Sequence, residues 1–273
     1  MAQCLATDRL KGVLIMVEQE VAVVFNEQVA LDTFLMGLQA KEVVREAAPG
    51  HFVMVRVHKG FDPLLRRPFS IAGTLGGDLF LILYRVVGQG TGILAEVRSG
   101  SRLSVLGPLG NGFRIVSSGT SSCLVGGGMG VAPLLFLAQR LNGMPFSFLA
   151  GYGNAAQIPA LDSFGLNPET FHIATEDGSR GHHGMVTDLL EEEVARLKEP
   201  VALFTCGPRP MMSRVAELAL EQGLPCQVSL EAEMACGLGA CQGCAVEASS
   251  ATDRFYLHVC TDGPVLDAGR VAW

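Results

Sequence analysis

The first part of the chain alternates apolar and polar residues with the two-residue period of β-strands. Glycine- and proline-rich turns such as APGH and GPLGNG separate these stretches. Short strands at this spacing predict an antiparallel β-barrel over residues 8–114, with one short helix at residues 91–97. The strand-like stretches span residues 10–20, 27–39, 51–58 and 78–87.

The pattern changes after residue 115, where apolar strands alternate with helical segments. Residues 121–141 begin with the apolar stretch SSCLV, continue with the glycine turn GGGMG and end in an apolar helical segment. Residues 185–198 (MVTDLLEEEVARLK) predict an amphipathic helix, for which Thr187 is a plausible N-cap. Alternating strands and helices predict a parallel sheet over residues 115–225, with ligands bound beyond the carboxyl ends of its strands.

The last 48 residues, 226–273, hold four cysteines in the spacing C-x4-C-x2-C-x15-C, at Cys236, Cys241, Cys244 and Cys260. This spacing is typical of plant-type [2Fe–2S] clusters, in which each iron takes two cysteine thiolates. Small residues between the ligands let the backbone approach the inorganic sulfur. A segment this short is predicted to need the cluster to hold its core together.

Two other interpretations of the four cysteines are weighed against the cluster. Structural zinc is the first alternative, although zinc sites usually use paired C-x2-C hooks and here the first gap is four residues. Disulfides are the second, and nothing in the chain indicates an oxidising compartment. The remaining cysteines are scattered, and for Cys4, Cys123 and Cys226 the favoured interpretation is a small buried apolar side chain.

Composition and net charge indicate which kinds of macromolecule the chain is expected to bind. The 273 residues are 49% hydrophobic and carry a net charge of −7, without a Lys- or Arg-rich run. We therefore expect neither nucleic acid nor an anionic membrane as a partner. The chain shows neither a signal-peptide pattern at its start nor an apolar run of about 18 residues, so we expect a cytoplasmic protein.

Two segments of the predicted barrel have the chemistry of a phosphate site. In LLRRPFSIAG, residues 64–73, the guanidinium of Arg67 suits a pyrophosphate, although a surface arginine on an edge strand is equally plausible. In LYRVVGQGT, residues 83–91, Tyr84 could stack on a flavin or adenine ring, and a helix beginning at Thr91 would bind phosphate. An ordinary strand, turn and helix would give the second pattern too.

Two segments of the predicted sheet are candidates for a second nucleotide. VGGGMGVAP, residues 125–133, joins a strand to a helix through a glycine turn that can bind phosphate, although it is not the G-x-G-x-x-G fingerprint. TCGPRPMM, residues 205–212, places Cys206 at a strand end, near the expected position of a nicotinamide. A core cysteine is as plausible from that segment alone.

In this order, the motifs resemble the ferredoxin–NADP reductase superfamily. Together with MACGLGACQGC and HVCTDGP they resemble one branch of it, the electron-transfer subunits of dihydroorotate dehydrogenase. The resemblance implies FAD, a [2Fe–2S] cluster and NAD as an exchangeable co-substrate. It assigns FAD to Arg67, Pro68, Phe69, Ser70, Leu83, Tyr84, Arg85, Gly90 and Thr91, the pyridine nucleotide to Gly126, Gly127, Gly128, Gly130, Cys206, Gly207 and Pro208, and the cluster to Cys236, Cys241, Cys244 and Cys260.

The resemblance also implies a partner and a reaction. The expected partner is a catalytic FMN-containing dihydroorotate dehydrogenase subunit, in a heterotetramer of two plus two chains. Electrons would pass between that subunit and NAD in pyrimidine biosynthesis. Because GYGNAAQIPAL lacks Lys and Arg, NAD is favoured over NADP, although Arg180 could reach a 2′-phosphate. The alternatives are the equivalent subunit of a sulfide dehydrogenase or of an NADH-dependent ferredoxin:NADP reductase, and a zinc-bound module without redox function.

Overall fold

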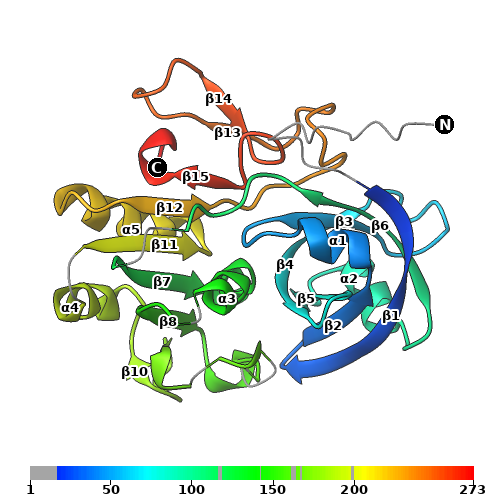
Figure 1. The fold of residues 1–273 in the computed structure, drawn as a ribbon, viewed down its shortest axis with the longest axis horizontal. Helices are drawn as coiled ribbons and strands as arrows, with labels where there is room; N and C mark the ends of the chain where they lie inside the picture. Colours follow the sequence, from blue (N-terminus) through cyan, green and yellow to red (C-terminus); the bar gives the residue numbers. More distant parts are fainter. Residues whose placement is uncertain (1–16, 116–118, 142, 161–163, 167, 198–199) are drawn as a thin grey trace, which may run out of the picture.

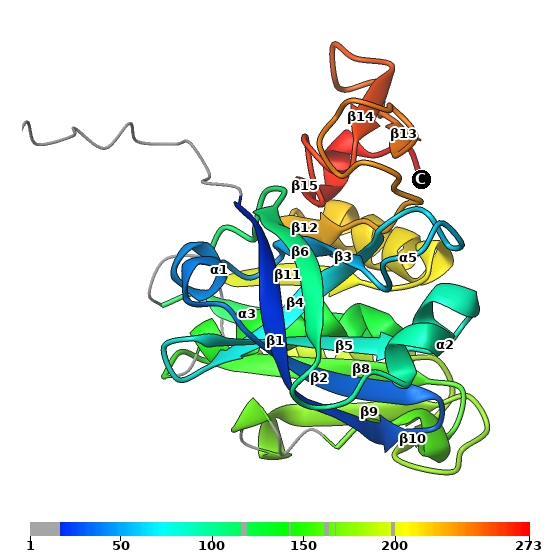
Figure 2. The same ribbon diagram turned by 90° about the vertical axis from the view of Figure 1, so that its right-hand side faces the viewer.

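The computed structural model describes residues 17–115, 119–141, 143–160, 164–166, 168–197 and 200–273. A barrel lies beside a parallel sheet, and a small hairpin with its loops caps one end of both (Figures 1 and 2). The predicted fold class is confirmed in all three parts.

Six antiparallel strands close the barrel in the order β1-β2-β5-β4-β3-β6. Two short helices, α1 and α2, lie between them, and α2 is the helix predicted from TGILAEV. The bounds are β1 Val17–Ala30, β2 Thr33–Gln39, α1 Lys41–Glu46, β3 Phe52–Arg56, β4 Arg67–Leu75, β5 Leu79–Arg85, α2 Gln89–Ala95 and β6 Arg102–Leu109.

The N-terminal strands differ from the prediction. One strand, β1, runs for 14 residues and includes the start of the segment predicted as the second strand. Residues 10–16 of the first predicted strand lie outside the described residues. Helix α1 was not predicted, because its six residues are too few to show a helical period.

The continuous apolar run of β5 has a simple cause. Phe80 and Ile82 point into the barrel core, whereas Leu81 and Leu83 pack in the core shared with the sheet domain. Helix α3 (Val131–Arg140) lies between barrel and sheet and covers that outer face (Figure 1). Both faces of β5 are therefore buried, and the usual alternation disappears.

Seven strands form the sheet, in the order β10-β9-β8-β7-β11-β12-β15. All its neighbouring pairs are parallel except β12 with β15, so the predicted parallel sheet is observed. The bounds are β7 Ser121–Gly127, β8 Phe146–Tyr152, β9 Phe171–Thr175, β10 His182–His183, β11 Val201–Cys206, β12 Cys226–Ser229 and β15 Val265–Asp267, and helices α4 (Asp188–Arg196) and α5 (Arg209–Glu221) cover the face opposite α3.

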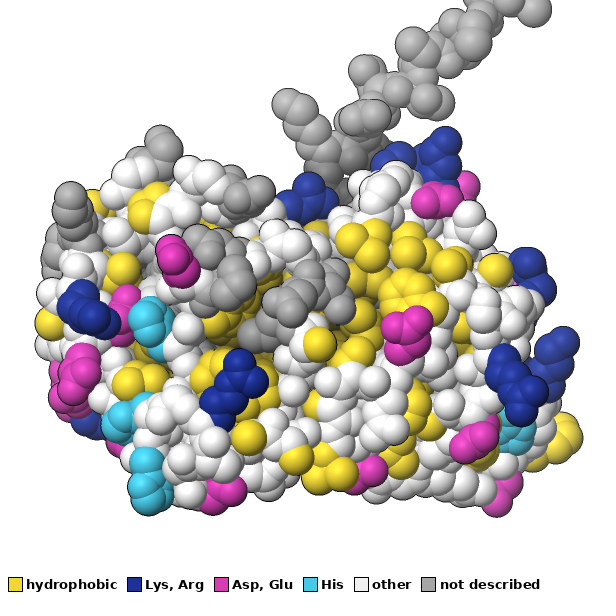
Figure 3. All heavy atoms as spheres, turned by 90° about the horizontal axis from the view of Figure 1, so that it is seen from below, with side chains coloured by type: hydrophobic (Ala, Val, Ile, Leu, Met, Phe, Trp, Pro, Cys, Tyr) yellow, Lys and Arg dark blue, Asp and Glu magenta, His cyan; other side chains and the backbone are white. Residues whose placement is uncertain are grey.

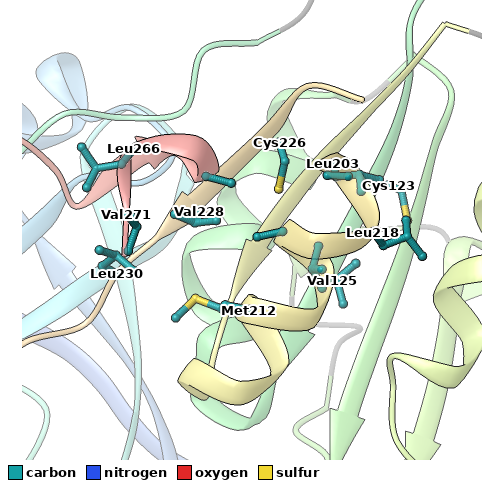
Figure 4. Close-up of a cluster of buried hydrophobic side chains, with 14 of the residues drawn as sticks. Cys123, Val125, Leu203, Met212, Leu218, Cys226, Val228, Leu230, Leu266 and Val271 are labelled. Carbon is teal, nitrogen blue, oxygen red and sulfur yellow. The ribbon is translucent and has the colours of Figure 1, made fainter. Parts of the chain in front are cut away.

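Two of the scattered cysteines, Cys123 and Cys226, pack as predicted for small apolar side chains, and Cys4 lies outside the described residues. Cys123 and Cys226 lie in the core between α5 and the sheet, among Leu203, Leu218 and Val228 (Figure 4). Burial raises the pKa of both thiols, so they stay protonated. Thr187 precedes α4 as expected, although its side chain makes no capping hydrogen bond.

The C-terminal part is joined to the rest more closely than predicted. Its two-stranded hairpin, β13 (Ala245–Glu247) with β14 (Tyr256–His258), projects from the body (Figure 2). Strand β15, however, pairs with β12 in the large sheet, and Leu257 and Val259 belong to the sheet's core cluster. The segment therefore shares its neighbours' core, and the expected need for a cluster to hold it together is not what its packing indicates.

The surface is chemically mixed. On the face shown in Figure 3, lysine and arginine side chains are interspersed with acidic and apolar ones. Within the part of the chain that the structure describes, no helix is long and apolar enough to cross a membrane.

Candidate cluster and nucleotide sites

The four predicted cluster cysteines come together at the top of the barrel and sheet. Cys236, Cys241 and Cys244 lie in the loop between β12 and β13, and Cys260 follows β14 by two residues. The sulfurs of Cys244 and Cys260 are 3.2 Å apart. The other two ligands are in contact as well, because the backbone N–H of Cys241 donates to the sulfur of Cys236 at 3.4 Å.

Backbone N–H groups point at these sulfurs, as an anionic cluster requires. Leu238 donates to Cys236 at 3.3 Å, Gly239 to Cys260 at 3.2 Å, and Gly243 to Cys241 at 3.5 Å. The N–H of Leu238 is the main cause that lowers the pKa of Cys236 to about 7. Burial, followed by the contact with Cys244, raises the pKa of Cys260 to about 11.

This donor set fits a [2Fe–2S] cluster. Four thiolates within one loop region, with amide donors directed at their sulfurs, are what such a cluster takes from a protein. The closest contacts among the four thiols are between Cys236 and Cys241 and between Cys244 and Cys260.

The cluster loop rests directly on the barrel. Gly237 adopts a φ of +73°, and a Cβ at this position would lie 2.8 Å from Cγ of Met54 and 3.2 Å from Cδ1 of Leu109. Met54 lies on β3 and Leu109 on β6. On the outer side of the loop, Cys241 is exposed and Leu238 is 43% exposed. One side of the cluster site therefore faces the barrel and the other faces solvent.

The flavin motifs meet around the start of α2. Arg67 packs so closely on Gly90 that an added Cβ would lie 2.8 Å from its Nε. The Thr91 hydroxyl accepts hydrogen bonds from the N–H groups of Val87 and Gly88 and fixes the turn that precedes the helix. A guanidinium beside the N–H groups of a helix start fits the pyrophosphate of FAD.

Tyr84 does not occupy the position predicted for it. Its ring is 2% exposed and stacks on Phe34 with centroids 5.7 Å apart. Its hydroxyl donates to Oδ1 of Asn26 at 2.9 Å, and Nδ2 of Asn26 donates to the carbonyl of Leu94 at the end of α2. Tyr84 therefore lies in the barrel core and supports α2 from beneath, instead of presenting its ring on the surface where a flavin or adenine could stack.

The pyridine-nucleotide motifs lie side by side at the carboxyl end of the sheet. Cys206 ends β11 and pairs with Gly126 of β7 and Ser229 of β12. A Cβ on Gly130 would collide with the backbone carbonyl of Cys206, so the two turns interlock. Burial is the main cause that raises the pKa of Cys206 well above its usual range, with the Glu231 charge second. Cys206 is 1% exposed and packs in the core beneath the glycine turn, as the alternative interpretation of a core cysteine expected, and its thiol stays neutral.

A small pocket between barrel and sheet contains a residue that the sequence did not indicate. Tyr152, at the end of β8, is 5% exposed, and its buried hydroxyl has no hydrogen-bond partner among the described residues. Arg85 lines the same pocket from the barrel, together with Gly128 and Met129 of the glycine turn and Gln157. Tyr152 sits in FLAGYGN, where a phenol at a strand's carboxyl end was the only signal.

Arg85 points away from the barrel core, towards the sheet domain. The resemblance assigned it to the strand lining the flavin, but its side chain points outward, at the glycine turn of the sheet domain. It makes no hydrogen bond or ion pair with any residue that the structure describes. An uncommitted cation, an unpaired phenol and a glycine turn therefore line one small pocket.

Solved structures share this arrangement of barrel and sheet. The NADH-dependent reduced ferredoxin-NADP oxidoreductase superimposes with a TM-score of 0.79, at 30% identity, over 93% of this chain and 90% of that chain. A ferredoxin NADP+ reductase from Neisseria gonorrhoeae with bound FAD and NADP superimposes with a TM-score of 0.64, at 16% identity, over 76% of this chain and 92% of its own. The fold is that of the ferredoxin reductases, here joined to a four-cysteine loop.

Relatives in sequence define the family. A family model described as the iron-sulfur cluster binding domain of dihydroorotate dehydrogenase B matches residues 231–272. The electron transfer subunit of dihydroorotate dehydrogenase B (NAD(+)) from Lysinibacillus sphaericus (strain C3-41) is 39% identical over 263 residues, which cover 93% of this chain and 98% of the relative. That of Desulforamulus reducens is 37% identical over 90% of this chain and 94% of its own. This chain belongs to the family of dihydroorotate dehydrogenase B (NAD(+)) electron transfer subunits, as the motifs predicted.

Proposed function

We propose that this chain passes electrons between NAD and an FMN-containing catalytic subunit of dihydroorotate dehydrogenase, through FAD and a [2Fe–2S] cluster that it holds itself. When bound, FAD supplies the conversion between hydride transfer and single electrons, and the cluster supplies one-electron transfer. The contribution of the chain is to bind these groups close together and to exclude water around them.

The observation that carries the proposal is the contact between the cluster loop and the flavin segment. Gly237, next to the ligand Cys236, packs on Met54, and Met54 pairs across β3 and β4 with Pro68. Pro68 belongs to the segment of Arg67 and Ser70 that we assign to FAD. Because neighbouring strands lie about 4.8 Å apart, the cluster loop is roughly one strand away from the flavin segment. Electrons therefore need to cross only a short distance.

NAD would bind across the interlocked turns. The glycine turn at residues 126–130 and the outward-facing Arg85 would face the diphosphate, Tyr152 offers a hydrogen bond, and the turn that follows the buried Cys206 would approach the nicotinamide ring. At the carboxyl end of β8, residues 153–160 contain no Lys or Arg for a 2′-phosphate. This composition supports NAD over NADP.

The exposed side of the cluster loop would face the catalytic partner. Leu238 and Cys241 are accessible there, and covering them would both shorten the electron path and keep water from the cluster. We expect a complex of two such chains with two catalytic subunits, located in the cytoplasm. An interface that left residues 231–244 uncovered would contradict this arrangement.

An anaerobic titration of the chain, co-purified with its partner, tests the proposal. We expect about one flavin and about two irons for each chain. NADH should bleach the flavin and produce the electron paramagnetic resonance signal of a reduced [2Fe–2S] cluster, and dihydroorotate should do the same through the partner. A colourless protein that contains zinc would refute the proposal and support the zinc-bound module.

A ferredoxin:NADP reductase subunit is the second candidate, because the solved structure with a TM-score of 0.79 and 30% identity is of that kind. The curated relatives, at up to 39% identity, favour the dihydroorotate dehydrogenase assignment. The co-purified partner separates the two candidates. An FMN-containing subunit reduced by dihydroorotate supports the first, whereas a pyridine-nucleotide flavoprotein reduced by NADPH supports the second.

Replacing Arg85 with alanine tests the nucleotide pocket. Loss of one charged contact to a diphosphate should raise the KM for NADH by about tenfold, equivalent to about 1.4 kcal/mol, and leave the flavin content unchanged. Tyr152→Phe should raise it less, because only a neutral hydrogen bond is lost. Steady-state oxidation of NADH by a small dye measures both. If Arg85→Ala instead lost flavin and kept its KM for NADH, Arg85 would belong to the FAD site.

A further inference from the structure

One residue that no motif indicated connects the barrel to the cluster loop. Asn111 follows β6 by two residues, and it lies against residues 261–265, directly after the ligand Cys260. Its Nδ2 donates to the carbonyls of Thr261 at 2.9 Å and Asp262 at 3.1 Å. Its backbone N–H donates to Gly263 at 2.7 Å, and its carbonyl accepts from Val265 at 3.4 Å. One residue therefore makes four hydrogen bonds to the loop.

The chemistry of these contacts selects an asparagine. The two acceptors are neighbouring backbone carbonyls, and a carboxamide NH2 offers two donors on one atom. An aspartate would place acceptors against acceptors, and an alanine would leave both carbonyls to water. The backbone of Asn111 is itself held in place, since Gly110 adopts a φ of +78° and packs so tightly that a Cβ would collide with Pro264.

Apart from its bonds to Asn111, the loop is tied to the end of β12, where the N–H of Leu230 donates to the carbonyl of Pro264 at 2.9 Å, and otherwise bonds within its own hairpin. The N–H groups of Thr261 and Asp262 both donate to the carbonyl of His258, at 3.0 and 2.8 Å. The Asp262 carboxylate accepts from the His258 N–H at 2.7 Å and from Arg254 at 2.7 Å. These bonds fix the shape of the loop, but they do not fix its position relative to the barrel.

Both sides of the cluster site thus rest on the end of the same strand. Leu109, the last residue of β6, supports Gly237 beside Cys236, and Asn111 supports the turn after Cys260. Phe52, which opens β3, also packs close to Gly110. Strand β3 pairs with β6 on one side and with the flavin segment of β4 on the other. The cluster loop is therefore fixed in position relative to the strands that carry the flavin segment.

We propose that Asn111 is a positioning residue that holds the Cys260 side of the cluster against the barrel, and thereby sets how fast electrons pass between FAD and the cluster and how firmly the iron is held. The proposal rests on the proposed function, because it needs both groups to be present. The step concerned moves one electron from reduced flavin to the oxidised cluster, with no bond formed or broken. Asn111 touches neither group and acts through the loop.

Asn111→Ala and Asn111→Ser in the intact complex with the catalytic subunit test this role. A polar cavity of about 600 Å³, lined by Asn111, His51 and Asp262 among others, adjoins the site. Water from this cavity can hydrogen-bond to the carbonyls of Thr261 and Asp262 when the Asn111 side chain is removed, so we expect both variants to fold. Gln227→Ala is the matched control. Its side chain ties β12 to Arg114, three residues after Asn111, through the Arg114 N–H and carbonyl, both at 2.9 Å, and does not touch the loop after Cys260.

Two measurements distinguish a role of Asn111 in positioning the cluster from a general loss of stability of the fold. The first is the rate at which dithionite-reduced protein releases iron to a ferrous chelator, which needs no turnover. The second is rapid mixing with NADH, which follows flavin bleaching and cluster reduction separately. For Asn111→Ala we expect iron release about tenfold faster and cluster reduction about tenfold slower, with flavin bleaching unchanged. Asn111→Ser, which keeps one donor, should lie between this variant and the wild type.

Several outcomes would overturn the proposal. Iron release and cluster reduction in the Asn111 variants that match those of Gln227→Ala would show that the hydrogen bonds to the loop do not matter. A parallel fall in flavin bleaching would show that Asn111 supports the fold as a whole. Failure of the proposed function is distinguishable, because the wild type itself would then lack an iron signal or an NADH-reducible flavin.

Discussion

Replacing Cys244 with serine should lower dihydroorotate-dependent reduction of NAD by more than about 100-fold, because the cluster loses a ligand that the structure buries in the loop. NADH oxidation by a small dye, which needs only the flavin, should remain. The flavin and nucleotide segments lie on the barrel and the sheet and do not depend on this thiol. Assays of both activities on one preparation, with its iron and flavin contents, measure the effect.

The control for this variant is a cysteine that makes no cluster contact. Cys226→Ser removes a thiol from the core between α5 and the sheet, so it should lower stability and leave iron content unchanged. Equal loss of iron in both variants would show that the effect spreads through the fold. Undiminished turnover with dihydroorotate in Cys244→Ser would show that electrons reach the flavin without passing through the cluster.

Replacing Arg67 with alanine should weaken FAD binding by roughly 10- to 100-fold, the value of one or two charge-assisted hydrogen bonds to a phosphate. The structure places this guanidinium against Gly90 at the start of α2, where the pyrophosphate would lie. Most of the flavin should then be lost during purification and should return when FAD is added in excess. Titration of the apoprotein with FAD, followed by flavin fluorescence, gives the dissociation constant.

Two further arginine variants show whether Arg67 acts through its shape or only through its charge. Arg67→Lys keeps the charge without the planar fork, and we expect it to recover part of the affinity. Arg85→Ala removes a cation from the next strand of the barrel, on its sheet-facing side, and should retain flavin fully. If Arg85→Ala lost flavin as readily as Arg67→Ala, the division of the two arginines between two nucleotides would be wrong.

The sequence predicted the elements well where a short period or a spacing encodes them. The two-residue alternation of residues 51–58 and the short apolar run of residues 78–87 predicted barrel strands, and the strand–glycine–helix order of residues 121–141 predicted the sheet. The four cysteines were predicted from spacing alone, since ligand chemistry restricts the residue types and the length of loop between them. In each case the information is local, so a single sequence is sufficient.

What the sequence could not predict depends on direction and on distant pairing. Tyr84 and Arg85 are neighbours on β5 and point to opposite sides, and which side faces the flavin depends on how the barrel closes. Tyr152 became a candidate only when the fold left its hydroxyl unpaired. Asn111 lies about 150 residues from the loop that it holds. No local pattern records such a contact.

The pairing of β12 with β15 has a consequence for how the sheet and the metal site depend on each other. Three ligands, at residues 236–244, follow β12, and the fourth ligand, Cys260, lies five residues before β15. The edge of the sheet and the fourth ligand therefore belong to one short stretch, residues 260–267. A chain without this stretch would have neither a closed sheet edge nor a complete set of ligands.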